Sequence, residues 1–431
     1  MFNKLVPFLL LPFLTRHLST EEFGIVSLVQ VLITFFNAAV GSSLQLNISR
    51  NIFTLEKNRF SIHLYNTVLV LLANCMLFTL ATSAFSIINQ DALGIPSRWL
   101  LVIPIIAAAN MLSIFNQTIL RAESRAWTYS AFEISASIVN LTLSLSLVLF
   151  LAMGWEGRAL GIAIPSLAYG LFSFWFMHKE KRLSYSFHPP DFKQIVIVSI
   201  PLFPHAISSM LMSVSDRFFL ANMVGPAEVG IYSVGYNFGM VIMLFSDAFA
   251  KAWNPWLLRM LAQPSTVRKI KVARASFIYI LALMLGTPIY ILLAQWAIPL
   301  VVGVEFAESS KFIPVICVSY VIFGIYQLFF PFLVLIKKTG FLAFSSVFAA
   351  GVNLAANYIL IQHYGGMGAA YSTLIAYGIS TLCVVWFVTH QYPLPWLQGF
   401  RSLLAPLTKS PFKDTEHILR HGPDSLREDQ Q

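Results

Sequence analysis

An adjacent charged pair, Asp216 and Arg217, lies inside a long apolar run of this sequence. An ionised group in hydrocarbon is costly unless it is paired or faces water, so such a pair marks a candidate site. On a helical wheel, His205, Ser209, Ser213 and Asp216 fall within ~80° of one another, and Arg217 lies ~40° beyond them. One polar stripe on an apolar helix predicts a wall of a water-filled cavity.

Two interpretations of this pair follow from the residues. Neighbours on a helix point ~100° apart, so we expect Asp216 and Arg217 each to find a partner on another helix. In the functional interpretation, Arg217 meets an anionic substrate and Asp216 tunes it or titrates. In the structural interpretation, the pair joins two helices near the outer membrane surface. His205 is open to the same choice, since a hydrogen-bonded interior histidine needs no further role.

Three more charged residues interrupt apolar segments. Glu133 is either an interfacial partner of Arg121 or Arg125 or a titrating group in a cavity. Asp247 and Lys251 have the i,i+4 spacing of an ion pair and lie near a cytoplasmic helix end.

No catalytic constellation accompanies these residues. The three cysteines, Cys75, Cys317 and Cys383, show no metal-ligand or redox spacing, and no glycine-rich phosphate loop follows a strand. We therefore do not expect an enzyme, and we expect no cofactor. Coupling of the protein's activity to protons or sodium ions is left open.

The elements that position these residues are membrane helices. The 431 residues are 57% hydrophobic and 11% charged, and apolar runs of about 20 residues, the length that crosses a bilayer, recur along the chain. Unbroken runs favour helices over a barrel, so we predict an all-α integral membrane protein. About twelve spans are expected: 2–18, 23–43, 62–88, 99–120, 127–152, 159–177, 195–222, 228–252, 273–301, 312–336, 340–362 and 367–390.

The distribution of cations tests this topology. With a cytoplasmic N-terminus, the twelve spans leave 23 of the 28 Lys and Arg on the cytoplasmic side, four outside, and Arg217 within a span. Arg158 is among the four assigned to outer loops. This asymmetry predicts that both termini are cytoplasmic and explains the net charge of +9 without nucleic acid, which we do not expect as a partner. Membrane lipids are expected contacts.

Two echoes indicate that the chain consists of two related halves. Residues 13–28 and 219–234 share six identities at an offset of 206, and Asn140 and Asn353 precede two similar glycine-containing segments. Because each half has six spans, the repeat is parallel, with substrate sites between the lobes. We predict four parts. These are an N-terminal lobe with a short first helix (1–178), a basic cytoplasmic linker (179–193), a C-terminal lobe (194–390) and a polar cytoplasmic tail (391–431). The short first helix leaves open a truncated helix or a start upstream of Met1.

These segments carry a family resemblance. The stretches IPLFPHAISSMLMSVSDRFFLANMVGPAEVGIYSVGYNFG, AFAKAWNPW and VNLAANYILIQHYGGMGAAYSTLIAY resemble the Wzx-type polysaccharide flippases of the MATE-like MOP superfamily, as do RHLSTEEFGI and ILRAESRAWTYS. The resemblance implies two six-helix lobes in a V, alternating access, and a substrate of undecaprenyl-diphosphate-linked oligosaccharide in the bacterial inner membrane. Polysaccharide polymerase machinery is an expected partner. The cation-coupled MATE relatives use an acid in the first helix, which this chain lacks.

Within that resemblance, Arg217 is our candidate for the diphosphate, because a guanidinium stays charged and bonds two oxygens. Asp216 and Asp247 are the candidates for proton or ion linkage. The alternative is a MATE-like exporter of small cationic compounds coupled to H⁺ or Na⁺, which predicts acidic cavity walls. A membrane scaffold, which predicts no polar stripe, and a lipid II flippase, whose relatives usually have two more spans, are the remaining alternatives.

Overall fold

A computed structural model describes the backbone of residues 2–403, with gaps at 89–93, 264 and 337. The side chains at 2–6, 42, 201–206, 208–209, 212–213, 339 and 342–343 lie outside the described residues.

The first half of the chain forms seven α-helices, two of which run on into π-helical turns at Ala38–Ser42 and Ser146–Phe150. The helices are α1 (Phe2–His17), α2 (Thr20–Asn37), α3 (Ser43–Asn51), α4 (Lys57–Ile88), α5 (Ser97–Ala122), α6 (Ala126–Leu145) and α7 (Gly154–Lys179).

The second half forms a further seven α-helices and a 3₁₀ segment at Val304–Phe312. The helices are α8 (Pro189–Met223), α9 (Pro226–Ala262), α10 (Thr266–Val301), α11 (Ile313–Leu335), α12 (Thr339–Tyr364), α13 (Gly366–Gln391) and α14 (Trp396–Arg401). The short α14 lies in the predicted tail and packs on α10, where the rings of Trp396 and Phe277 are 5.7 Å apart.

The all-α membrane fold is confirmed. A helix lies at each of the twelve predicted ranges, and within the described residues ten helical segments are long and apolar enough to cross a membrane. Many helices expose large apolar side chains outward, as lipid-facing helices must. The crossings by α1 and α8 stay predictions.

Helix α2 begins with a capping box. The Ser19 hydroxyl accepts a hydrogen bond from the Glu22 backbone N–H, and the Ser19 N–H donates to the Glu22 carboxylate. This reciprocal capping box satisfies two backbone donors that the helix itself leaves unpaired. The sequence S-T-E-E therefore fixes where α2 begins.

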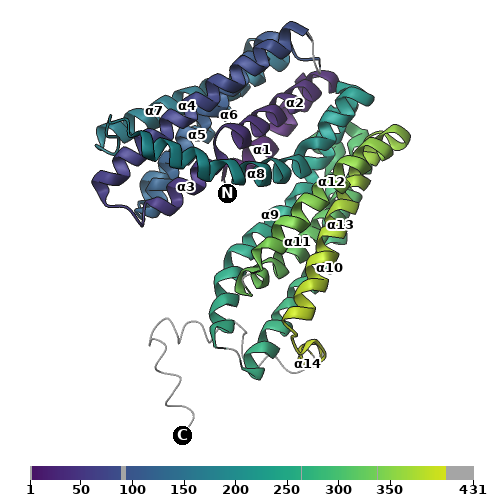
Figure 1. The fold of residues 1–431 in the computed structure, drawn as a ribbon. Coiled ribbons are helices and arrows are strands. Elements are labelled where there is room, and N and C mark those ends of the chain that lie inside the picture. The colour runs from purple at the N-terminus through teal and green to yellow at the C-terminus, as the bar shows by residue number, and fades with distance from the viewer. Residues whose placement is uncertain (1, 89–93, 264, 337, 404–431) are drawn as a thin grey trace.

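The helices gather into two groups that diverge from one shared end, as Figure 1 shows. We call α1 to α7 the N-terminal group and α9 to α14 the C-terminal group. The α3 end of the first and the α9–α10 connection of the second point away from each other. Helix α8 contacts α3 and α4 of the N-terminal group as well as α12 and α13 of the C-terminal group, so it bridges the two.

At the shared end, α2 and α9 cross with glycine against glycine. A Cβ on Gly24 would lie 1.8 Å from the Pro226 carbonyl oxygen, and a Cβ on Gly230 would lie 2.0 Å from the Thr20 carbonyl oxygen. Gly24 and Gly230 are equivalent at the repeat offset of 206, and so are Thr20 and Pro226. The contact is therefore reciprocal, which is what a parallel repeat predicts for its two halves.

The second echo, the two glycine-containing segments that follow Asn140 and Asn353, also forms equivalent turns. Gly154 and Gly365 both adopt left-handed backbone angles, with φ of +56° and +54°. The Glu22 carboxylate lies beside Gly154, and the equivalent Glu228 accepts the backbone N–H of Gly366 at 3.2 Å. Left-handed backbone at each of these turns favours glycine.

Candidate functional site

Asp216 and Arg217 are buried on α8 and are bound by α9. The Tyr232 hydroxyl donates to Asp216 Oδ2 at 2.6 Å, and Arg217 Nε donates to the Ser233 hydroxyl at 3.2 Å. The expectation of partners on another helix is therefore met. The expectation that the pair does not meet is wrong, because Arg217 Nη1 lies 3.7 Å from Asp216 Oδ1. The long arginine side chain folds back across the ~100° that separates the two positions.

Aromatic rings complete the surroundings of the guanidinium. Arg217 Cζ lies 4.3 Å from the ring centre of Tyr236 and 5.9 Å from that of Tyr232. The Tyr320 hydroxyl donates to the Tyr236 hydroxyl at 2.5 Å, so the ring that stacks on the arginine is itself held. Cation–π contacts with desolvated rings are worth about 2 kcal/mol or more, so these rings hold the Arg217 guanidinium in place.

The fixed arginine lines a cavity of about 280 Å³ between the two groups. We call this the central cavity. Its walls come from α1, α2 and α7 on one side and from α8, α9, α11 and α13 on the other; its polar lining includes Gln30, Arg158, Arg217, Ser233, Tyr236 and Tyr320. Among the described residues, the charged ones in its lining are two arginines, Arg158 and Arg217, while Asp216 lies behind the wall.

Arg158 is a charged cavity residue that sequence reasoning missed. The charge tally placed it in an outer loop, but it lies in the first turns of α7 and is 3% exposed. Its Nη1 donates to Asn140 at 2.9 Å and to Ser144 at 2.6 Å, whereas its Nε is buried without a hydrogen-bond partner. The predicted span began at residue 159, whereas α7 begins at Gly154. A prediction with this earlier start would have placed Arg158 inside the span.

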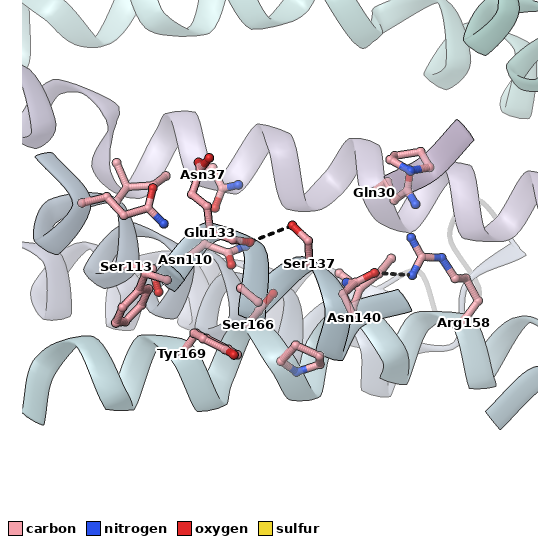
Figure 2. Close-up of a pocket in the computed structure, with 17 residues that line it drawn as sticks. Gln30, Asn37, Asn110, Ser113, Glu133, Ser137, Asn140, Arg158, Ser166 and Tyr169 are labelled. Atoms are coloured by element: carbon pink, nitrogen blue, oxygen red, sulfur yellow. Dashed lines mark hydrogen bonds between the residues drawn. The ribbon is translucent and has the colours of Figure 1, made fainter. Parts of the chain in front are cut away.

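A second cavity, of about 430 Å³, lies within the N-terminal group and shares Arg158 with the first. We call it the amide cavity. Figure 2 shows its uncharged donors and acceptors from α2, α5, α6 and α7: Gln30, Asn37, Asn110, Ser113, Ser137, Asn140, Ser166 and Tyr169. Arg158 donates to Asn140 at one end of this cavity. Glu133 also lines the cavity. The structure thus places Glu133 beside a cavity, the setting of the second of its two interpretations.

The remaining predicted residues lie elsewhere or outside the description. Side chains of His205, Ser209 and Ser213 fall outside the described residues, so the proposed stripe on α8 stays a prediction. Asp247 accepts a hydrogen bond from Gln327 of α11 at 2.8 Å, and Lys251 is exposed one turn further along α9. Neither Asp247 nor Lys251 lines the central cavity or the amide cavity.

The comparisons with known proteins agree with this geometry. A family model described as "Polysaccharide biosynthesis protein" matches residues 1–261. The chain belongs to this family. Its curated relatives are 22–28% identical, and the chain spans between 45% and 85% of their own lengths. One is named "Probable low-salt glycan biosynthesis flippase Agl15", from Haloferax volcanii, and is 22% identical over 51% of this chain and 45% of the relative.

Solved structures of two membrane transporters share the fold of this family member. The inward closed form of the lipid II flippase MurJ superposes with a TM-score of 0.68 over 97% of this chain and 94% of its own, at 15% identity. An inward-facing MATE family multidrug transporter gives a TM-score of 0.64 over 90% of this chain and 94% of its own, at 14% identity. The predicted MATE-like architecture is therefore confirmed at the level of the fold.

Proposed function

We propose that this protein flips lipid-linked oligosaccharides across the bacterial inner membrane by alternating access. The observation that carries the proposal is the pair of fixed arginines, Arg158 and Arg217, in one cavity where the two helix groups meet. A lipid diphosphate is a dense anion that must leave water to cross ~30 Å of hydrocarbon. Two guanidinium groups in a low-dielectric cavity offset that loss, and each can bond two phosphate oxygens.

The neighbouring amide cavity suits the sugars of the same substrate. Asn, Gln, Ser and Tyr side chains offer both donors and acceptors, which is what the hydroxyl and amide groups of a glycan require. Because Arg158 borders both cavities, a diphosphate held there leaves the attached sugars next to the amide donors. The apolar tail stays in the bilayer throughout.

The state of the transporter follows from the predicted topology. With cytoplasmic termini, the glycine contact of α2 and α9 closes the outer end, and the diverging ends of the two groups open toward the cytoplasm. Substrate would then load from the cytoplasm, where lipid-linked repeat units are assembled, and leave outward once this contact opens. Polymerase machinery on the far side is the partner that this direction of transport implies.

Coupling to an ion is a further part of the proposal. Asp216, Glu133 and Asp247 are the acids within the membrane that could exchange a proton. Vesicle flipping that is indifferent to an imposed pH gradient would rule out proton linkage and leave the flipping itself intact.

The test of the function uses surface glycan in cells that depend on this protein. We expect Arg217→Ala and Arg158→Ala to abolish most surface glycan at unchanged protein level, and Arg217→Lys to retain part of it. Removing one charge-assisted contact of about 1.5–3 kcal/mol corresponds to a roughly ten- to hundred-fold loss. The matched control is Arg98→Gln, since Arg98 lies at the same end of the molecule but is exposed and pairs with Glu156 outside the cavities. Normal glycan in both alanine variants would contradict the assignment.

Export of cationic compounds is the second candidate, and the cavity walls argue against it. The two charged groups that the described residues contribute to the central cavity are cations, which repel a cationic drug. A drug-susceptibility screen separates the two functions.

A further inference from the structure

A third polar cavity, of about 440 Å³, lies where the end of α3 meets the starts of α4 and α8. We call it the α3–α4–α8 cavity. Helix α3 lies away from the end that the two groups share, on the side where they diverge (Figure 1). Among the described residues, the charged lining of the cavity is Arg50, Arg59 and Asp191, and its neutral polar lining is Asn47, Asn51, His63 and Gln194.

Two polar groups of this cavity are deeply buried. Asp191 is 8% exposed; its Oδ1 pairs with Arg59 at 3.3 Å and lies 3.4 Å from His188 Nδ1. The other carboxylate oxygen, Oδ2, is buried and has no hydrogen-bond partner. His63, 7% exposed, is held between Asn51 at 2.9 Å and Asn47 at 3.3 Å. A buried carboxylate oxygen without a donor is costly, so this wall is incomplete as it stands.

The charges of the lining residues indicate which kind of ligand would fit the α3–α4–α8 cavity. Arg50 and Arg59 outnumber Asp191, so the lining carries one net positive charge when His63 is neutral. A ligand with one negative charge and a hydroxyl donor matches this wall, with its phosphate on the arginines and its hydroxyl on Asp191 Oδ2. A diphosphate carries too much negative charge for a wall that includes a carboxylate.

Apolar residues border the same cavity. Leu46 of α3 and Val198 of α8 line it and are 56% and 37% exposed. An exposed apolar edge beside a polar cavity at the ends of membrane helices fits a molecule with a polar head and hydrocarbon chains. Basic pockets between membrane helices on the cytoplasmic side are typical sites for anionic lipid heads.

We propose that the α3–α4–α8 cavity binds the headgroup of a singly charged phosphodiester lipid that carries hydroxyls, of the phosphatidylglycerol type. Arg50 and Arg59 hold the phosphate, Asp191 accepts from a glycerol hydroxyl, and Leu46 and Val198 contact the first part of an acyl chain. Bound there, the lipid joins α3 and α4 to the first turns of α8, the helix that bridges the two groups.

The test measures retained lipid by native mass spectrometry of the full chain, delipidated and then offered phosphatidylglycerol or phosphatidylethanolamine. We expect the wild type to retain phosphatidylglycerol in preference, and Arg50→Gln to reduce this at least several-fold. Asp191→Asn should reduce the preference between the two lipids, because the hydroxyl loses its charged acceptor. The control is Lys193→Gln, since Lys193 is an exposed cation on the same turn of α8 that does not line the cavity.

Arg50 is substituted instead of Arg59 because Arg59→Gln would also remove the ion pair with Asp191 and could prevent folding. Equal retention of both lipids, or unchanged retention in Arg50→Gln, would overturn the proposal. A third arm offers glycerol 1-phosphate in detergent. Protection against thermal unfolding by this soluble phosphate, equal to that given by the lipid, would assign the cavity to a soluble ligand instead. None of these readouts depends on flipping, so they stand apart from the test of transport.

Discussion

Gly24 of α2 and Gly230 of α9 face each other, and the backbone of each fills the space that a side chain on the other would need. A Cβ added to Gly24 would lie 3.2 Å from the Gly230 nitrogen, and one added to Gly230 would lie 3.1 Å from the Gly24 nitrogen. The two helices can approach so closely only because both positions lack a side chain. This contact closes the end of the molecule at which the central cavity lies.

Substitution at this contact should shift the transporter toward its outward-open state. In Gly24→Ala the new Cβ would overlap the Pro226 carbonyl, so α2 and α9 must separate. An overpacking cost of about 1–3 kcal/mol changes the ratio of two states by roughly 5- to 150-fold. The measurement is labelling of Ser233→Cys, in a background without the native cysteines, by an impermeant maleimide added from outside.

The control for this experiment is Gly286→Ala on α10. Gly286 is also within a helix, but a Cβ there would meet nothing within 4 Å. We expect its labelling rate to match the parent. If Gly24→Ala labels no faster than Gly286→Ala, the α2–α9 contact is not the outer closure.

Tyr232 should act as a positioning residue for the arginine. Its hydroxyl holds Asp216 Oδ2 and so limits how closely the carboxylate approaches the guanidinium, whose Nη1 lies 3.7 Å from Oδ1. Tyr232→Phe frees Asp216 to pair more closely with Arg217 and to compete with phosphate. We therefore expect a roughly tenfold higher substrate concentration for half-maximal flipping, from a lost contact of about 1.5 kcal/mol or more.

A second tyrosine provides the comparison. The Tyr290 hydroxyl donates to the Phe238 backbone oxygen at 2.6 Å, and Tyr290 does not line the central cavity. Tyr290→Phe should lower thermal stability and leave the half-maximal concentration unchanged. A Tyr232→Phe variant that loses only stability would show that Tyr232 has a purely structural role.

Acid should weaken an ion-pair cluster just beyond α7. Partial burial raises the pKa of the Glu180 carboxyl, but the hydrogen bond from Arg125 and the charge of Arg182 outweigh it, and the net pKa is lowered from 4.5. Arg125 Nη1 donates to Glu180 at 2.7 Å, and Arg182 Nη2 donates to Glu123 at 2.6 Å. Because the folded pKa is below the unfolded value, the cluster stabilises the fold fully above about pH 4.5 and loses this contribution as pH falls through the folded pKa.

The corresponding measurement is the melting temperature of the wild type and Glu180→Gln in detergent between pH 3.5 and 7. We expect the variant to melt lower at pH 7 and the two to converge toward pH 3.5. The matched control is Glu308→Gln, since Glu308 is an exposed acid that pairs only with its neighbour Lys311 on the surface. A constant difference between wild type and Glu180→Gln at every pH would contradict this linkage.

The sequence by itself determined the class of fold and the repeat. Apolar runs long enough to cross a bilayer require helices, because lipid offers no partners for an open backbone. The identities at Glu22 and Glu228, and at Gly24 and Gly230, marked two equivalent turns before any contact was known. Asp216 and Arg217 were conspicuous because charge within an apolar run is costly wherever the helix lies.

Only the tertiary structure decided which of these residues meet. Arg158 and Arg217 are 59 positions apart and line one cavity because α7 and α8 belong to walls that converge at the shared end. The uncharged polar side chains around Glu133 come from four helices, so no local spacing reveals them. Helical periodicity fixes the face on which a side chain lies, but packing between helices fixes what that face meets, and for Arg158 a start of α7 five residues earlier moved a loop cation into the site.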